Sequence, residues 1–231
     1  MSALSQPVTA AKQSTSTNEA STSYLSLKLS AAMWARVLVL WLTLAIAALV
    51  IGAFAIGMGA FIRSNIREEL TSQQIKFSPA ENLTERERAI PGMVENAGQP
   101  LATGNQAKVY SELILLHVSE SAEEAGYPGA AYATLGGVQR ELRAEVAAAK
   151  EANNEEALAA AQEKLDAVTS LRNTMLTAST LRGNLLSAYG WDNVGLGVIA
   201  AGVVICAFAL VFFLLFLFER RRGHLPPTDA I

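Results

Sequence analysis

Two long apolar runs, Val37–Ile62 and Val194–Phe218, dominate the pattern of hydrophobic and polar positions, and neither contains a charged residue. They hold 26 and 25 residues, whereas about 20 helical residues are enough to cross a bilayer core of roughly 30 Å. Each run therefore predicts a membrane-spanning helix. A cleaved signal peptide ending near Ala53–Ala55 is the alternative for the first run, but the run exceeds the roughly 7–15 apolar residues of a signal peptide.

The polar stretch between the runs, residues 63–193, carries apolar residues three and four positions apart, which is the spacing of amphipathic helices. This spacing predicts three long helices, over Asn105–Ser119, Ala131–Lys150 and Asn154–Tyr189. A break at Asn153–Glu156 separates the last two, because asparagine caps helices and glutamate suits their first turn. These two helices are therefore expected to form an antiparallel hairpin.

Local signals divide the rest of the polar stretch. The first span is expected to continue as a helix to Gln74, and a loop is expected around Phe77–Pro79. Thr84–Glu87 has the spacing of a capping box, and Pro91–Gly92 ends the short turn that the box starts. The last long helix is expected to enter the second apolar run through residues 190–193.

The predicted fold class is therefore all-α, with two transmembrane helices flanking an extracytoplasmic helical domain. Ser, Thr, Ala and Gln dominate the N-terminal segment, which has too little apolar surface to offset the entropy of ordering. The predicted boundaries are a disordered cytoplasmic tail over 1–32, a first span over 33–62, the helical domain over 63–193, a second span over 194–218 and a cytoplasmic tail over 219–231.

Charge predicts the orientation in the membrane. The polar stretch carries 12 Lys and Arg against 18 Asp and Glu, a net charge of −6, while Arg220–Arg222 follow the second run directly. Basic residues near the ends of spans stay on the cytoplasmic side. Arg63 and Arg67 oppose this trend, but they stand beside two glutamates. We expect a bacterial plasma-membrane protein with both termini cytoplasmic and residues 63–193 outside.

Small residues recur inside both runs at a spacing of four, which lets helix backbones approach closely in lipid. The spans are expected to pack on each other or on a partner's helix through these positions, although Gly and Ala are common in spanning helices anyway. The candidate packing residues are Ala53, Ala55, Gly57, Gly59, Gly197 and Ala201.

A candidate contact surface lies where the last long helix meets the membrane. It consists of Arg182, Gly183, Tyr189 and Trp191. The alternative is that these residues serve the fold: glycine for close packing, arginine for an ion pair and tryptophan as an interfacial anchor.

The sequence offers little material for catalysis. His117 is the one histidine between the runs, and the one cysteine, Cys206, lies in the second run. A transition-metal site needs three or four converging ligands, so His117 is predicted to be a hydrogen-bonded structural residue and Cys206 a packing residue. We predict no enzyme activity, no cofactor and no metal. The acidic outer region and its lack of basic clusters also argue against a nucleic-acid partner.

Several segments of the polar stretch carry a resemblance to a known group of proteins. They are Gln74–Pro79, Pro91–Gly92, Ala97–Gln99, Gly104, Ala107–Tyr110, His117 and, most strongly, Thr180–Trp191. With these segments the chain resembles a group of actinobacterial two-pass membrane proteins of uncharacterised function, some of which are labelled as aromatic ring-opening dioxygenases. The resemblance implies the topology and the plasma-membrane location, but no activity, because extradiol cleavage uses iron held by more than one histidine.

Two functional hypotheses remain. The first is a non-enzymatic membrane protein whose outer domain and spans contact another membrane protein or a second copy, as an accessory subunit of an envelope or respiratory complex. The second is an extracytoplasmic ligand-sensing domain. Since 13 residues follow the second run, a sensor is expected to signal through a separate partner.

Overall fold

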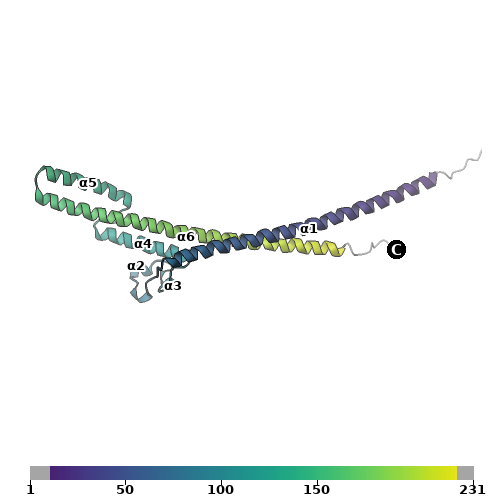
Figure 1. Cartoon of the computed structure of the whole chain (residues 1–231), viewed down its shortest axis with the longest axis horizontal. Coiled ribbons are helices and arrows are strands. Elements are labelled where there is room, and N and C mark those ends of the chain that lie inside the picture. The colour runs from purple at the N-terminus through teal and green to yellow at the C-terminus, as the bar shows by residue number, and fades with distance from the viewer. Residues whose placement is uncertain (1–10, 223–231) are drawn as a thin grey trace, which may run out of the picture. The chain divides into compact units, whose positions relative to one another are not determined.

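The computed structural model describes residues 11–222, with side chains from residue 33 onward, and no strand occurs among them. The predicted all-α fold is confirmed. In chain order the elements are α1 (Ala11–Ser72), the 3-10 helix η1 (Ala80–Asn82), α2 (Glu85–Arg88), α3 (Met93–Asn96), α4 (Gly104–Glu124), α5 (Tyr132–Glu151) and α6 (Glu155–Arg222) (Figure 1).

The chain forms two compact units. The first comprises residues up to Ile56 together with those from Ala200 onward, and the second comprises Gly57–Ile199. Helices α1 and α6 each contribute to both units. The short helices and both α4 and α5 belong to the second unit.

Helix α1 begins at Ala11, so the backbone of residues 11–32 is helical where the sequence predicted a disordered tail. The difference has a local reason. No glycine or proline occurs between Pro7 and Gly52, and adding a residue to an existing helix is much easier than starting a new one. Residues 1–10 and 223–231 of the two predicted tails lie outside the described part of the chain.

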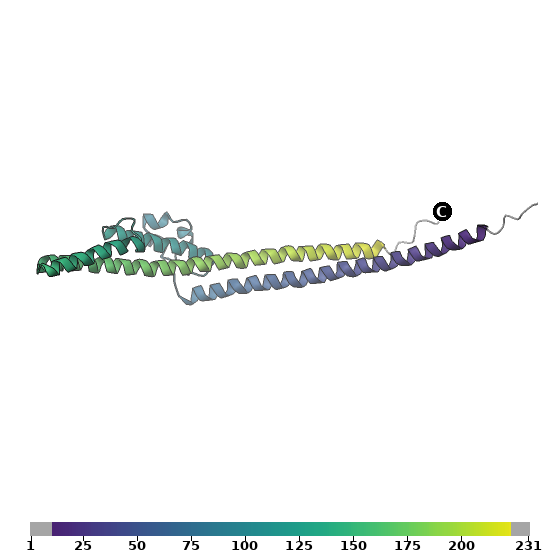
Figure 2. The same ribbon diagram turned by 90° about the horizontal axis from the view of Figure 1, so that it is seen from above.

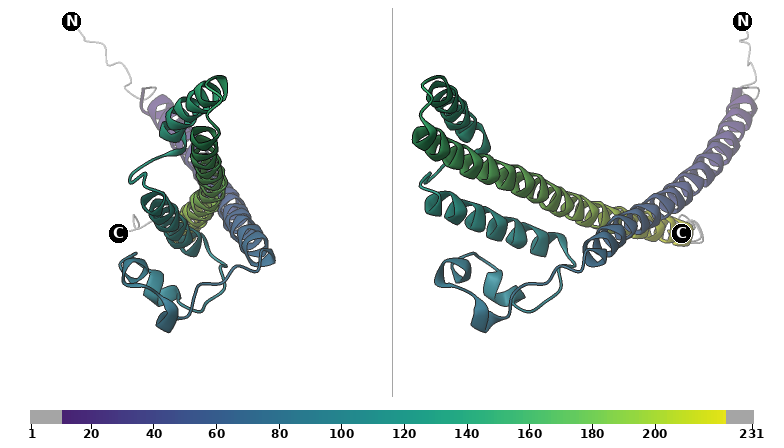
Figure 3. Two further views of the ribbon diagram at one scale, coloured as in Figure 1. Left: turned by 90° about the vertical axis from the view of Figure 1, so that its left-hand side faces the viewer. Right: turned by 60° about the vertical axis from the view of Figure 1, so that its left-hand side comes forward.

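The three long helices predicted in the polar stretch are confirmed. Helix α4 extends further than predicted, to Glu124. Its last turns carry Ala122, which is fully buried in a hydrophobic cluster with residues of α5 and α6. Helix α6 passes without a break through residues 190–193. Figures 1 and 3 show α4 and α5 lying on either side of the first part of α6.

Two hydrophobic clusters hold the second unit together. One lies near the end of α1 and the start of α4, and consists of Leu70, Phe77, Leu83, Met93, Leu101, Ala107, Leu113 and Leu185. The other lies between the end of α4, helix α5 and the first part of α6, and consists of Ala122, Leu135, Leu142, Val168, Leu171 and Met175.

Polar contacts fix the register of α5 against α6. The side-chain amide of Gln139 donates to Thr169 Oγ1 at 2.8 Å, and Arg172 donates to the carbonyl of Tyr132 at 3.3 Å. Tyr132 precedes Gln139 on α5, whereas its partner Arg172 follows Thr169 on α6. The two helices therefore run antiparallel.

The segment between α1 and α4 is irregular but well bonded, and Figure 2 shows its short helices gathered beside α4. The capping box predicted at Thr84 is present: its hydroxyl accepts from the Glu87 N–H, and the Glu87 carboxylate accepts from the Thr84 N–H. Gly92 adopts a positive φ of 87°, a backbone conformation that is strained for any residue with a side chain. The short helix α3 that follows was not predicted.

Candidate functional site

In the first unit, α1 and α6 pack backbone against backbone at Gly52 and Gly202. A Cβ atom on Gly52 would lie 2.5 Å from Cys206 Sγ and 2.9 Å from the Gly202 carbonyl oxygen. A Cβ on Gly202 would lie 2.7 Å from the Gly52 carbonyl oxygen. All three separations are shorter than a normal van der Waals contact, so only glycine fits at either position without a shift of the helices. Cys206 takes part in this packing, as predicted from the sequence.

The second unit repeats this contact at Gly59 and Gly195. A Cβ on Gly59 would lie 2.5 Å from the Gly195 carbonyl oxygen, and a Cβ on Gly195 would lie 2.8 Å from Arg63 Cγ. These glycines therefore allow the two helices to approach closely beside the polar residues that follow the first apolar run.

The glycines at the contact are seven residues apart on each helix, at 52 and 59 and at 195 and 202. Seven residues are close to two helical turns, so each pair lies on one face of its helix. Ala45 and Ala209 continue the same spacing and are buried. Gly52, Gly195 and Gly202 were not predicted, because the prediction rested on small residues four positions apart and these glycines recur at a spacing of seven.

Of the six predicted packing residues, Gly59 alone is one of these contact glycines. A Cβ on Gly57 or Gly197 would meet nothing within 4 Å. Ala53 and Ala201 are exposed, and Ala55 is half-buried. These positions are open on the described chain, so their packing against a partner's helix stays a prediction.

Arg63 and Asp192 link α1 to α6 just beyond the glycine contact. Arg63 Nε donates to Asp192 Oδ1 at 2.9 Å, and the Asp192 side chain is only 14% exposed. Asp192 also lies against Gly104 at the start of α4, where a Cβ would be 3.0 Å from Oδ2. A carboxylate at this position suits the positive end of the helix.

Arg182 and Gly183 from the predicted contact surface share a groove of about 250 Å³ between α4 and α6. The Arg182 guanidinium donates from Nη2 to Glu112 Oε1 at 3.3 Å, while its Nε is buried without a hydrogen-bond partner. A Cβ on Gly183 would meet nothing within 4 Å, so this part of the groove is open. The other lining residues are Ile114, Leu115, Val118, Ala178, Ser179 and Leu186.

The other two predicted contact residues do not line this groove. The Lys108 ammonium lies 5.2 Å from the centre of the Tyr189 ring, which is a cation–π contact between α4 and α6. Trp191 is 59% exposed. Because it follows Tyr189 by two residues, it lies about 200° further around the helix.

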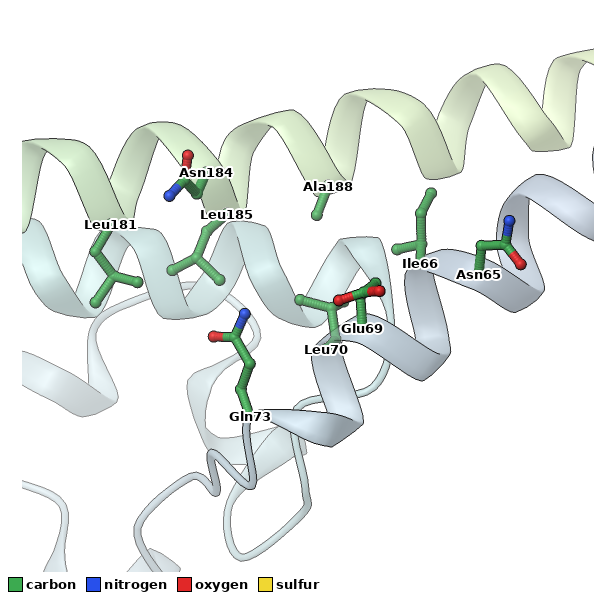
Figure 4. A pocket seen from close by; sticks show the side chains of 9 residues that line it. All are labelled: Asn65, Ile66, Glu69, Leu70, Gln73, Leu181, Asn184, Leu185 and Ala188. Carbon is green, nitrogen blue, oxygen red and sulfur yellow. The ribbon is translucent and has the colours of Figure 1, made fainter.

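A second cavity, of about 310 Å³, lies between the end of α1 and α6 and is drawn in Figure 4. Its apolar side includes Ile66, Leu70, Leu181, Leu185 and Ala188. Its polar side chains make no hydrogen bond within the described part of the chain; they are Asn65, Glu69, Gln73 and Asn184. None of the four was predicted as a site residue, although Asn65, Glu69 and Gln73 recur at a spacing of four and so share one face of α1.

His117 is hydrogen-bonded, as predicted: its Nε2 lies 2.9 Å from Glu87 Oε1. This pair ties α4 to the capping box of α2. The pKa of Glu87 is lowered, first by the hydrogen bond from the Thr84 backbone N–H and further by His117. The imidazole is more exposed, at 54%, than its place on an apolar stripe suggested.

Among residues 33–222, no group of three or more His, Cys, Asp or Glu side chains is placed to hold a metal ion. Comparisons of the chain with protein-family models, with curated proteins and with solved structures found no match. The described residues form a close helix pair, a groove between α4 and α6 and a cavity between α1 and α6.

Proposed function

We propose that the chain is a two-pass plasma-membrane protein with cytoplasmic termini and residues 63–193 outside. Two of its helices, Met33–Ser72 and Glu155–Arg222, are long and apolar enough to cross a membrane. Only 11% of the most apolar window of each is buried within the protein. Exposure of such apolar helices to water would cost a large amount of free energy, whereas in a bilayer their side chains contact lipid.

The proposed role is non-enzymatic: the outer helices and the spans contact another protein, as an accessory subunit of an envelope or respiratory membrane complex. The groove at Arg182 and Gly183 carries this proposal. Its walls are apolar, Leu115 on its rim is 41% exposed, and the buried Nε of Arg182 lacks an acceptor. A partner that inserts an apolar side chain and offers a carbonyl or carboxylate would satisfy both the walls and the arginine.

The groove can be tested without disturbing the fold. Gly183→Leu places a side chain where a Cβ meets nothing, so it should fill the groove and leave the packing of α6 intact. Gly137→Leu, on α5, is the matched control because a Cβ there also meets nothing. The full chain is purified from native membranes in mild detergent, and co-purifying proteins are quantified by mass spectrometry.

We expect a stoichiometric partner with the wild type and with Gly137→Leu, and its loss with Gly183→Leu. A monodisperse wild-type particle without any co-purifying protein would contradict the proposal. If both variants retain the partner equally, the groove is not the contact site.

A ligand-sensing role is the second candidate, and the cavity in Figure 4 favours it. Four polar side chains that make no hydrogen bond with the described residues line a space of about 310 Å³, which suits a small polar ligand. The sensor would signal through a separate partner. A ligand-dependent shift in the unfolding temperature of the full chain, absent in Asn184→Leu, supports this role, and no shift with any compound of a metabolite panel counts against it.

A further inference from the structure

Another cavity of the second unit, of about 390 Å³, lies where the first apolar run gives way to charge. Four of its lining residues come from α1: Ala60, Arg63, Ser64 and Arg67. Arg63, Ser64 and Arg67 follow Ala60 by three, four and seven positions, which places all four residues on one face of the helix. The opposite walls come from α6 and the segment leading into α4; they are Ala102, Thr103, Asp192 and Ile199.

The cavity has an excess of positive charge. Of its three charged side chains two are arginines, and its one carboxylate, Asp192, is already bonded to Arg63 Nε. Arg67 makes no ion pair or side-chain hydrogen bond among residues 33–222. The Arg67 guanidinium, the terminal nitrogens of Arg63 and the hydroxyl of Ser64 are therefore free to donate. Bidentate donors of this kind match the oxygens of a phosphate group.

The two ends of the cavity also differ in polarity. Ala60 and Ile199 fall inside the two apolar runs, whereas Arg63 is the first residue after the first run and Arg67 is one turn further on. One end of the cavity is thus apolar and the other cationic. A phospholipid at a bilayer surface has the same order of groups, with its acyl chains beside its phosphate.

We propose that this cavity binds the head group of an anionic phospholipid in the outer leaflet, with the phosphate held by Arg63 and Arg67 and the glycerol end against Ala60 and Ile199. This assignment rests on the membrane topology proposed above. It also gives a role to the two arginines that oppose the positive-inside trend.

The test uses the full chain in nanodiscs that contain phosphatidylglycerol and phosphatidylcholine in equal amounts. After extraction into mild detergent, retained lipids are counted by native mass spectrometry. The variants are Arg67→Gln, Arg67→Lys, and, as a matched control, Arg143→Gln, which removes an exposed arginine of α5. Competition is measured with short-chain phosphatidylglycerol and with inorganic phosphate.

The wild type and Arg143→Gln should retain phosphatidylglycerol in preference to phosphatidylcholine. Arg67→Gln should reduce this preference about fivefold, the effect of one cationic side chain at an anionic surface, and Arg67→Lys should restore most of it. Competition by the short-chain lipid but not by phosphate supports the proposal. Equal competition by phosphate would reassign the cavity to a free oxyanion and overturn it.

Absence of any preference in the wild type also overturns the proposal. This result is distinguishable from a failure of the proposed topology, since protein that never enters the membrane is released by an alkaline carbonate wash. Protein that resists the wash but shows no lipid preference refutes the lipid site alone.

Discussion

Arg63 donates from Nε to Oδ1 of Asp192 at 2.9 Å, across 129 positions of sequence. The acceptor is largely buried, and its other oxygen lies against the glycine that starts α4. The pair therefore connects α1, α4 and α6 within the second unit. It does so next to Gly59 and Gly195, where the backbones of α1 and α6 touch.

Asp192→Asn should lower the free energy of unfolding by about 1 kcal/mol, because the Arg63 side chain remains 42% exposed and water screens much of the attraction. Denaturant unfolding of the full chain in detergent measures this. A double-mutant cycle with Arg63→Gln should give a positive coupling energy between the two sites. Strictly additive effects of the two substitutions would show that the ion pair does not stabilise the fold.

Gly59→Ala should destabilise the protein by about 1–3 kcal/mol, because the added Cβ would lie 2.5 Å from the Gly195 carbonyl oxygen and force the helices apart. Gly57→Ala is the matched control. Its Cβ meets nothing within 4 Å, so the higher helix propensity of alanine should leave stability unchanged or raise it by up to about 1 kcal/mol. The same unfolding assay applies, and equal effects of the two substitutions would contradict the glycine contact.

Patterns that are local in sequence predicted most of the fold. The start of α6 follows from an asparagine-rich break, and its continuity through residues 190–193 is consistent with the absence of proline there. The capping box at Thr84 follows from four consecutive residues. In these places the physical cause lies within one or two helical turns, so the sequence displays it directly.

Contacts between segments that are distant in the sequence could not be predicted from such local patterns. Gly52 lies seven residues from Gly59 on α1, and Gly202 lies seven residues from Gly195 on α6, but Gly52 and Gly202 are 150 residues apart. Their contact can be recognised only when it is known which faces of α1 and α6 meet. The Arg63–Asp192 bond has the same character. The candidate cavities consist of such contacts, so Arg67 and Asn184 gave no local signal as site residues. Arg182 and Gly183 were predicted from their place before the second apolar run, and their contact with a partner stays a prediction.

Thr169→Val should cost about 1–2 kcal/mol of unfolding free energy. Gln139 is only 5% exposed, and its amide nitrogen donates to the Thr169 hydroxyl at 2.8 Å. Valine has nearly the same shape but accepts no hydrogen bond, so the Gln139 amide would be left unsatisfied. Thr174→Val, which removes an exposed hydroxyl bonded only within its own helix, is the control and should have little effect on the same denaturant transition. A comparable loss in both variants would indicate that the Gln139 bond adds nothing.

Stability should also depend on Glu87 at acid pH. The Thr84 N–H and His117 favour its charged form, so the pKa of Glu87 is lower in the folded protein than its ordinary value of 4.5. The resulting stabilisation is fully present above the ordinary pKa and is lost as the pH falls through the lowered one. Glu87→Gln keeps an acceptor for the Thr84 N–H but carries no charge, so its unfolding free energy should fall less steeply than that of the wild type as the pH is lowered from 4.5. Glu85→Gln, which changes an exposed glutamate of the same short helix, should follow the wild-type curve. Parallel curves for wild type and Glu87→Gln across this range would rule out a stabilising contribution from the Glu87 charge.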